Sequence, residues 1–448
     1  MKVMQYVTAP NVNFRKYESR PIPSFMGGAT TVEIGKSPVM KDFLGFGVAL
    51  TASSCYELNT MSPDARKIFL EDIYTEKGLN LSLARLTVGS SDYSAELYSY
   101  DDVDGDVDLR HFSIDRDRDY VIPMIKEVLA VHPDLYLYSS PWTPPAWMKT
   151  GHSLCGGFMR AGFVECYADY IIRYIEEYEK EGIQVRAVTP QNEAETHQNG
   201  RMPACKWHPD IEAEFILVLK KKLAEKGRDI GIWMLDHNFD LYQRVMWMLE
   251  EYPDLKQNGI GVAWHYYGGS FEMADVVKRA HPDLPFHFTE GGPRLYDNYA
   301  TDHAKWATVM IEALCHGCRS FCGWNLMLDE TGGPNIGPFF CGGLVTLNSV
   351  TGDLTYSGQY HAFRHLSKFI CKGAEIYDCV IAGEGDCYFS YPKRAMPLHA
   401  VLAKNTDGSR VLVVANGDKE KRQIQCDFGG EKYYFELLPD SVSTVVIE

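Results

Sequence analysis

The chain has 448 residues, of which 45% are hydrophobic and 23% charged, a composition typical of a globular protein and not of a disordered one. Its formal net charge of -16 argues against nucleic acid and acidic membrane surfaces as partners, because phosphate groups are bound by clustered lysine and arginine. The sequence shows neither a signal peptide nor an apolar run of the ~18 residues that cross a membrane. We therefore expect a cytoplasmic protein.

The 12 cysteines are scattered without the spacing of a disulfide framework, so we expect reduced thiols. Cys315, Cys318 and Cys322 form a C-x-x-C-x-x-x-C pattern that resembles one arm of a metal site. A fourth ligand at matching spacing is absent, and Cys322 lies in an apolar run typical of a buried strand. Packed thiols are therefore favoured over metal ligands, and no metal or other cofactor is expected.

Eight short β-rich runs alternate with longer helical patterns between about residues 44 and 325. They are apolar over most of their length, as expected for strands of a parallel sheet that is covered on both faces. The runs cover residues 45–51, 79–88, 135–140, 184–193, 230–236, 260–266, 286–290 and 319–325. Eight such units match a (β/α)8 barrel in number and size. An open doubly wound sheet is the alternative, but its Gly-rich first turn is missing.

Amphipathic helical patterns fill the segments between these runs. Their apolar residues recur at the spacing of one buried helix face. The clearest of them cover residues 64–78, 119–132, 163–182 and 210–227. Ser62 and Pro63 are typical of a helix start, and Gly78, Gly182 and Gly227 are typical of helix ends.

The C-terminal part differs from the rest. From about residue 376 the chain consists of short alternating runs separated by turn signals such as Asp407-Gly408, the pattern of an antiparallel β module. The segment TTVEIG near the N-terminus is expected to add a strand or two to it. The sequence thus predicts an α/β protein with a catalytic barrel at 41–372 and an attached β-sandwich from residues 1–40 and 373–448.

Two glutamates stand at the ends of predicted barrel strands, Glu193 in TPQNE and Glu290 in FHFTE. Catalytic groups of such barrels lie at the carboxyl ends of the strands, whereas most other acidic residues are solvated on the surface. Two carboxylates across one barrel mouth are what glycoside hydrolysis needs, because one protonates the leaving oxygen and the other attacks or supports the oxocarbenium-like centre.

Aromatic and polar residues at other strand ends fit a sugar pocket. Flat rings cover sugar C–H surfaces, and amides, carboxylates and imidazoles bind hydroxyl groups. The residues concerned are Asp92, Trp142, Trp147, Asn192, His265, Tyr266, Tyr267, Trp324 and Asn325. The alternative for the aromatic residues is packing of the barrel top. For His265 the alternative is a metal or triad role, but no H-E-x-x-H or G-x-S-x-G motif accompanies it.

These motifs resemble glycoside hydrolase family 30, the family of lysosomal glucosylceramidase, along nearly the whole chain. The matching segments are LGFGVALTASS, LARLTVGSSDYS, SSPWTPPAWMK, AVTPQNE, WHYY, FTEGG and GWNLMLDETGGPN. The resemblance implies a barrel with a β-sandwich and retaining hydrolysis. It further implies Glu193 as acid/base and Glu290 as nucleophile, with sugar contacts by Arg85, Asp92, Trp142, Asn192, His265, Tyr267 and Trp324.

The sequence also departs from the family pattern at positions around the expected sugar pocket. Ala52 stands where relatives of glucosylceramidase often have Asp, and Ala194 stands where Pro often follows the acid/base. Glucose, xylose, fucose, galactose and glucuronic acid all occur as substrates in the family. We expect an exo-acting enzyme for small β-glucosides, with β-glucuronide as the main alternative and β-xyloside or β-fucoside as others. Three arginines could bind a uronate carboxylate, Arg160, Arg201 and Arg294.

Two other function classes compete with this one. A carbohydrate-binding protein without catalysis would not need both Glu193 and Glu290. A metal-dependent or phosphate-binding barrel would need a clustered ligand set or a Gly-rich phosphate loop after the seventh and eighth strands. The expected partner is therefore a small glycoside or oligosaccharide, and the sequence does not predict an oligomeric state.

Overall fold

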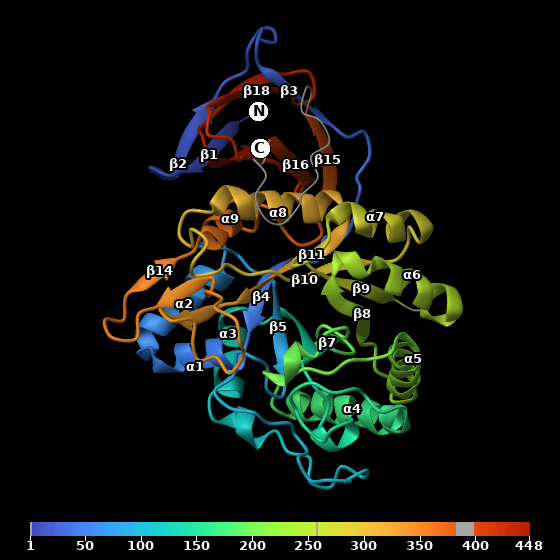
Figure 1. Ribbon diagram of the computed structural model, residues 1–448. Helices are drawn as coiled ribbons and strands as arrows, with labels where there is room; N and C mark the ends of the chain where they lie inside the picture. Colours follow the sequence, from blue (N-terminus) through green and yellow to red (C-terminus); the bar gives the residue numbers. More distant parts are fainter. Residues whose placement is uncertain (1, 257–258, 382–397) are drawn as a thin grey trace.

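The computed structural model describes residues 2–256, 259–381 and 398–448 (Figure 1). Eight parallel strands close into a barrel in the order β10-β11-β4-β5-β6-β7-β8-β9. Their bounds are β4 Gly45–Leu50, β5 Leu83–Val88, β6 Tyr136–Pro141, β7 Val185–Val188, β8 Gly231–Asn238, β9 Ile260–His265, β10 Phe286–Glu290 and β11 Cys318–Asn325. The predicted (β/α)8 barrel is confirmed, and each strand overlaps one of the eight predicted runs.

Helices surround the barrel because each buries one apolar face against the strands. They are α1 Ala52–Thr60, α2 Pro63–Tyr74, α3 Val121–Val131, α4 Val164–Lys180, α5 Pro209–Glu225, α6 Tyr242–Glu251, α7 Phe271–Ala280, α8 His303–Cys315 and α9 Gly358–Leu366. Ser62 caps α2 by accepting from the N–H of Ala65. Gly182 and Gly227, both with positive φ, follow α4 and α5 as predicted. The expectation for Gly78 was wrong, because α2 ends at Tyr74.

Both chain ends form a second layer of strands, which lies above α8 and α9 in Figure 1. This nine-stranded sheet has the order β19-β18-β3-β15-β16-β17-β20-β1-β2 and is antiparallel except for the β18–β3 pair. Its strands are β1 Val3–Ala9, β2 Val12–Ser19, β3 Thr30–Ile34, β15 Glu375–Ile381, β16 Leu398–Lys404, β17 Arg410–Asn416, β18 Arg422–Asp427, β19 Lys432–Leu437 and β20 Ser441–Ile447. The predicted module from both chain ends is therefore present.

The sheet curls until β19 contacts β2 and β20, and it encloses an apolar core separate from that of the barrel. Polar contacts join the two parts: His365 of α9 lies within hydrogen-bond distance of the hydroxyls of Thr8 and Thr444. His399 of β16 likewise lies 2.6 Å from a carboxylate oxygen of Glu312 on α8. Apolar residues of the sheet, among them Ile376, Val401 and Val413, also pack into the same buried cluster as the barrel, so apolar and polar contacts together hold the curled sheet on the side of α8 and α9.

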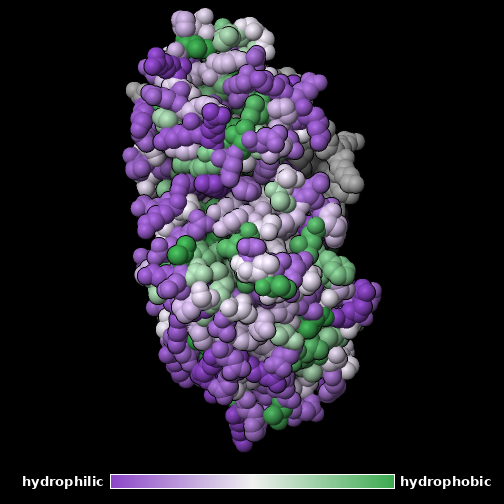
Figure 2. Space-filling view, turned by 90° about the vertical axis from the view of Figure 1, so that its left-hand side faces the viewer, coloured by the Kyte–Doolittle hydropathy of each residue, from purple (hydrophilic) through white to green (hydrophobic). Residues whose placement is uncertain are grey.

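A small three-stranded sheet of β12 Met327–Asp329, β13 Val345–Leu347 and β14 Leu354–Tyr356 follows the last barrel strand. The loop between β12 and β13 reaches over the barrel mouth. Figure 2 shows one face of the molecule, on which hydrophilic residues dominate and hydrophobic residues form small separate groups. Among the helices in the described part of the chain, none combines the length and hydrophobicity needed to cross a membrane.

Candidate active site

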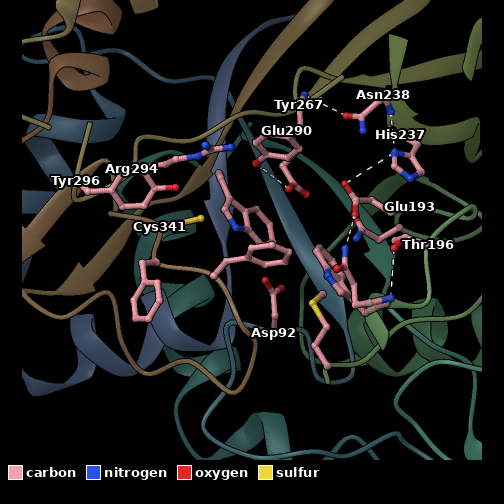
Figure 3. Close-up of a pocket in the computed structure, with 17 residues that line it drawn as sticks. Asp92, Glu193, Thr196, His237, Asn238, Tyr267, Glu290, Arg294, Tyr296 and Cys341 are labelled. Atoms are coloured by element: carbon pink, nitrogen blue, oxygen red, sulfur yellow. Dashed lines mark hydrogen bonds and ion pairs between the residues drawn. The ribbon is translucent and has the colours of Figure 1, made fainter. Parts of the chain in front are cut away.

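A cavity of about 450 Å³ opens at the carboxyl ends of the barrel strands (Figure 3). This volume lies in the range of small-molecule sites. The cavity is lined by Asp92, Trp142, Asn192, Glu193, Thr196, Gln198, Met202, His237, Asn238, Tyr267, Glu290, Arg294, Tyr296, Trp324, Phe339, Phe340 and Cys341. Glu193 and Glu290 therefore share one pocket, as the strand-end rule predicts.

Glu290 is the last residue of β10 and is 6% exposed. One carboxylate oxygen accepts a hydrogen bond from Arg85 Nη1 at 2.5 Å, and the other accepts from the Tyr267 hydroxyl at 3.0 Å. Both donors stabilise the ionised carboxylate. Glu290 is thus held in a fixed orientation with its charge facing the pocket (Figure 3).

Glu193 does not end its strand, in contrast to the prediction, because β7 stops at Val188. The residue lies on the following turn with φ of 53°, and its N–H donates to the carbonyl of Asp236 on β8 at 2.9 Å. Its carboxylate lies 3.3 Å from His265 Nδ1 and 3.4 Å from Gln198 Nε2. One oxygen of Glu193 and one of Glu290 lie within 4.8 Å of each other.

Asp236 connects most of the buried polar groups below the pocket. It is fully buried at the bulge near the end of β8. Its two oxygens accept hydrogen bonds from the guanidinium of Arg85 and from the hydroxyls of Ser140, Thr189 and Thr289. One oxygen also lies 2.9 Å from His265 Nε2. Sequence reasoning missed this residue, although it ends the run IGIWMLD and the strand-end rule applies to it equally.

Burial and charge act in opposite directions on the carboxyl groups of the site. Burial would raise the pKa of Asp236, but Arg85 and His265 hold it well below its usual range. Burial, followed by the charge of Glu193, raises the pKa of Glu290 despite His265 and Arg85. Burial also works against ionisation of Glu193, but His237 and His265 lower its pKa to about 2.

His265 and Glu193 lie close enough to share one proton. The ionised Asp236 accepts from Nε2–H of His265, so Nδ1 faces Glu193. Burial lowers the pKa of His265, but the charges of Glu290 and Asp236 outweigh it and raise that pKa to about 9. These two pKa values place the proton on His265, and transfer to the oxygen 3.3 Å away gives a neutral Glu193. Either arrangement keeps one proton beside the pocket.

Glu193, His265 and Glu290 are also the one group of three possible metal ligands found in the described ranges, with donor atoms within 4.8 Å. Both nitrogens of His265 already lie against carboxylates, and the guanidinium of Arg85 neutralises Glu290. A divalent cation here would lie against a buried positive charge, so the donor set favours proton chemistry. The cysteines of the C-x-x-C-x-x-x-C pattern do not belong to this group of ligands, and two of them, Cys318 and Cys322, are buried in β11.

Two tryptophans and one aspartate form the inner part of the pocket. The rings of Trp142 and Trp324 stack with centroids 5.2 Å apart, and the guanidinium of Arg85 lies 4.8 Å from the Trp142 ring. Asp92 is 4% exposed, and its Oδ1 is buried without a hydrogen-bond partner among the described residues. Burial, followed by the charges of Glu290 and Glu193, raises the pKa of Asp92 well above its usual value. This carboxyl group is available to a hydroxyl of a bound molecule.

The mouth of the pocket has an aromatic side and a polar side. Tyr296, Phe339 and Phe340 are 67%, 41% and 68% exposed, and their loops pair through Arg294 and Cys341. Across the pocket, on the side of Glu193, lie Thr196, His237 and Asn238 (Figure 3). Gln198 lies on the same side, with its Nε2 3.4 Å from the Glu193 carboxylate. A molecule leaving the site therefore passes between ring surfaces and hydrogen-bonding groups.

The predicted residues fall into three groups. Asp92, Trp142, Asn192, Glu193, Tyr267, Glu290 and Trp324 line the pocket. Arg85 and His265 are fully buried behind the two glutamates. Trp147, Tyr266 and Asn325 lie outside the lining: the indole of Trp147 donates to Asp101 O, Tyr266 packs on Trp306, and Asn325 accepts from the Thr51 hydroxyl. Of the candidate uronate ligands, Arg294 lines the pocket, whereas Arg160 and Arg201 do not.

The pocket-lining residues that sequence reasoning missed come from the end of β8 and from the loops. His237 and Asn238 end β8, Thr196, Gln198 and Met202 follow Glu193, and Tyr296, Phe339, Phe340 and Cys341 come from the two paired loops. The end of β8 was detectable by the strand-end rule. The others carry no periodic signal, because loop conformation depends on contacts made after folding.

Comparison with known proteins identifies the fold. The family model described as the glycosyl hydrolase family 30 TIM-barrel domain matches residues 43–370. The putative glucosylceramidase 3 of Caenorhabditis elegans is 30% identical over 366 residues, which is 77% of this chain and 70% of that protein. The endo-1,6-beta-D-glucanase of Neurospora crassa is 29% identical over 395 residues, which is 83% of this chain and 78% of that protein.

A solved structure is similar over the full length. The structure of the endo-beta1,6-glucanase BT3312 superposes with a TM-score of 0.87 at 25% identity, covering 100% of this chain and 99% of that one. The likeness therefore includes the curled sheet as well as the barrel.

Proposed function

The chain belongs to glycosyl hydrolase family 30, and on that premise we propose that it is a retaining, exo-acting β-glucosidase of small β-glucosides. Family membership makes it a glycoside hydrolase that acts on carbohydrate. The proposal adds the stereochemical course, the sugar and the mode of attack. Glu290 is proposed as the nucleophile and Glu193 as the acid/base.

The separation of the two carboxylates carries this proposal. Retaining glycosidases hold their carboxyl groups ~5–5.5 Å apart, whereas inverting enzymes need ~6.5–9.5 Å to admit a water molecule. An oxygen of Glu193 and an oxygen of Glu290 lie within 4.8 Å, which supports the retaining geometry.

The reaction follows from the positions of the protons. A carboxylate oxygen of Glu290 attacks the anomeric carbon, while Glu193 donates its proton to the glycosidic oxygen and the aglycone leaves as an alcohol. Hydrogen bonds from Arg85 and Tyr267 favour the ionised form of Glu290, which is the form that attacks. Glu193, now a base, then takes a proton from water, which attacks the anomeric carbon and releases the sugar. The charge of Asp236 supports His265 in both steps.

An unmodified hexose fits the inner pocket better than a uronate. Asp92, Glu193 and Glu290 already place three carboxyl groups around one cavity, and a glucuronate would add a fourth. The raised pKa of Asp92 reflects how unfavourable further negative charge is there. Arg294 at the mouth is the observation in favour of β-glucuronide, which stays as an alternative together with β-xyloside and β-fucoside.

Replacement of Asp92 by Asn is expected to lower kcat/KM for an aryl β-glucoside roughly 10- to 100-fold, because an amide does not reproduce the hydrogen bonds that the buried carboxyl group makes to a sugar hydroxyl. Asp104→Asn, on an exposed loop, is the matched control and should leave kcat/KM unchanged. Steady-state kinetics of both variants test this. An Asp92→Asn enzyme with wild-type kcat/KM would remove Asp92 from sugar binding.

Endo-hydrolysis of a β-1,6-glucan is the second candidate. Two similar proteins carry the name endo-1,6-beta-glucanase, and the exposed rings of Tyr296 and Phe340 at the mouth could support further sugar residues. Ceramide is a less suitable aglycone, because the side of the mouth next to Glu193 is polar.

The experiment is a substrate panel with product analysis. Purified protein is incubated with aryl β-glycosides of glucose, glucuronic acid, xylose, galactose and fucose, and with a linear β-1,6-glucan. Preferential cleavage of the glucoside, with glucose as the sole early product, supports the proposal. Early release of β-1,6-linked oligosaccharides would replace it by the endo-glucanase, and preference for the glucuronide would overturn the choice of sugar.

The proton shared by Glu193 and His265 gives a pH prediction. The enzyme is active while the pair holds that proton, so kcat/KM falls as rising pH removes it. Because the pKa of His265 is raised from 6.5 to about 9, the alkaline limb is expected above the ordinary histidine range. In His265→Asn only the carboxyl group of Glu193 can hold the proton, so the alkaline limb of the kcat/KM profile should move to lower pH. Identical alkaline limbs in both proteins would contradict the shared proton.

A further inference from the structure

We propose that the buried ion pair of Arg244 and Glu212 is a positioning element for Glu193, which it holds at the leaving group. The inference rests on the proposed role of Glu193 as acid/base. Neither residue lines the pocket, and both act through the backbone around Glu193.

Three non-glycine residues at the acid/base adopt the left-handed conformation. Glu193, Leu235 and Asp236 have φ of 53°, 73° and 47°. Leu235 and Asp236 form the bulge that interrupts the pairing of β8 with β9, and the carbonyl of Asp236 accepts the N–H of Glu193 at 2.9 Å. Such conformations are unfavourable for side chains with a Cβ and persist only where surrounding contacts enforce them. The position of Glu193 therefore depends on what holds this bulge.

Glu212 of α5 holds the bulge from outside the barrel. The residue is 1% exposed, and its Oε1 accepts the N–H of Leu235 at 2.8 Å. Its Oε2 accepts two hydrogen bonds from Arg244 of α6, from Nε at 3.0 Å and from Nη2 at 2.7 Å. One carboxylate thus connects the left-handed backbone of β8 to a guanidinium on the next helix.

Arg244 extends this connection to the chain that follows Glu193. Its Nη1 pairs with the carboxylate of Glu195, and its Nη2 donates to the carbonyl of Trp207 at 2.9 Å. The N–H of Trp207 in turn donates to the carbonyl of Ala194, also at 2.9 Å. The guanidinium therefore holds the chain on the C-terminal side of the acid/base, while Glu212 holds the strand that receives its N–H.

Stability alone does not account for such an arrangement. A buried ion pair is often no more stable than apolar side chains of the same volume, because both charges lose their hydration. The hydrogen bonds of a guanidinium fix geometry in a way that apolar packing does not. This pair bridges α5, α6, β8 and the turn after β7, so its removal should displace Glu193 relative to Glu290.

The consequence depends on the leaving group. An aryl glucoside with a strongly acidic phenol needs no proton to leave, whereas one with a weakly acidic phenol does. A misplaced acid should therefore lower kcat/KM, which reports glycosylation, for the second substrate alone. A displacement of about 1 Å costs on the order of 100-fold in rate.

The experiment compares Arg244→Met with Arg66→Met on the 2,4-dinitrophenyl and 4-methoxyphenyl β-glucosides. Arg66 is a matched control, because it too is a buried arginine that holds a glutamate by two hydrogen bonds, to Glu127, and it lies on α2. Arg244→Met is expected to lose about 100-fold in kcat/KM on the methoxyphenyl substrate and less than about twofold on the dinitrophenyl substrate. Arg66→Met should lower Tm without changing the ratio of the two rates.

Further variants keep the test decisive if Arg244→Met does not fold. Glu212→Gln retains the volume and the acceptor for Leu235 but weakens the pair, and Arg244→Lys retains the charge without the planar geometry; both should shift the ratio in the same direction. An unchanged ratio in folded variants, or an equal loss on both substrates, overturns the proposal. A wild-type protein that cleaves neither glucoside would instead refute the proposed function.

Discussion

Glu290→Gln is expected to lower kcat on an aryl β-glucoside by about 10⁵-fold or more, the scale on which enzymes lose activity without their nucleophile. An amide oxygen of similar size cannot form the glycosyl ester. The fold should survive, because the guanidinium of Arg85 still contacts the carboxylate of Asp236 and the amide oxygen of Asn192. Steady-state kinetics, with Tm as a measure of folding, test this expectation.

The same residue should carry the covalent intermediate. The fluorine of a 2-deoxy-2-fluoroglucoside slows both the formation and the hydrolysis of the glycosyl ester. A good leaving group keeps formation faster than hydrolysis, so the ester accumulates. Mass spectrometry of proteolytic peptides should then find the sugar on the peptide that contains Glu290. A label on any other carboxylate, or a Glu290→Gln enzyme with substantial activity, would contradict the assignment.

Removal of the carboxyl group of Glu193 should give the second largest effect, and its size should depend on the substrate. Glu193→Ala is expected to lose about 10²–10⁴-fold in kcat/KM on a glucoside with a weakly acidic phenol, which is the usual contribution of general acid catalysis. The loss in kcat/KM should be small on the 2,4-dinitrophenyl glucoside. Steady-state kinetics on the two substrates measure the difference.

Azide provides an independent control for this variant. It attacks the glycosyl ester without needing a base, so it should raise kcat of Glu193→Ala on the dinitrophenyl glucoside and yield the β-glucosyl azide. Glu290→Gln should form no β-glucosyl azide. Absence of rescue in Glu193→Ala, together with an equal loss on both substrates, would assign the acid/base role to another residue.

The sequence was sufficient to predict the barrel because its signal is repeated eight times. Each strand is apolar on both faces, and each helix has one apolar face, so periodicity reports the two layers directly. Helix ends were predictable where a glycine adopts positive φ, as at Gly182 and Gly227. The prediction failed at Gly78, where the chain continues for a short turn beyond the helix before reaching the next strand.

The site was predictable only in part. Glu193 and Glu290 stand out because acidic residues next to apolar strands are rare, and Asp236 could have been found in the same way. The ion pair of Arg244 and Glu212 was not predictable, since both residues look like ordinary polar positions of amphipathic helices. The expectation of a cytoplasmic location stays a prediction.

The loops at the mouth show why substrate is harder to predict than mechanism. Tyr296 and Phe340 come from segments without periodicity, and their juxtaposition depends on the pairing of Arg294 with Cys341. The hydrolytic chemistry depends on strand ends whose positions the barrel fixes, whereas contacts beyond the inner pocket depend on loops whose conformation has no periodic signal in the sequence.

The stereochemistry of the first product tests the central claim most directly. Proton NMR can follow the anomeric signals while the wild-type enzyme hydrolyses an aryl β-glucoside, before the released sugar mutarotates. Two carboxylates within 4.8 Å predict that β-glucose appears first and the α-anomer only later. Initial release of α-glucose would mean an inverting reaction with a water between the carboxylates, and it would contradict the assignment of Glu290 as nucleophile.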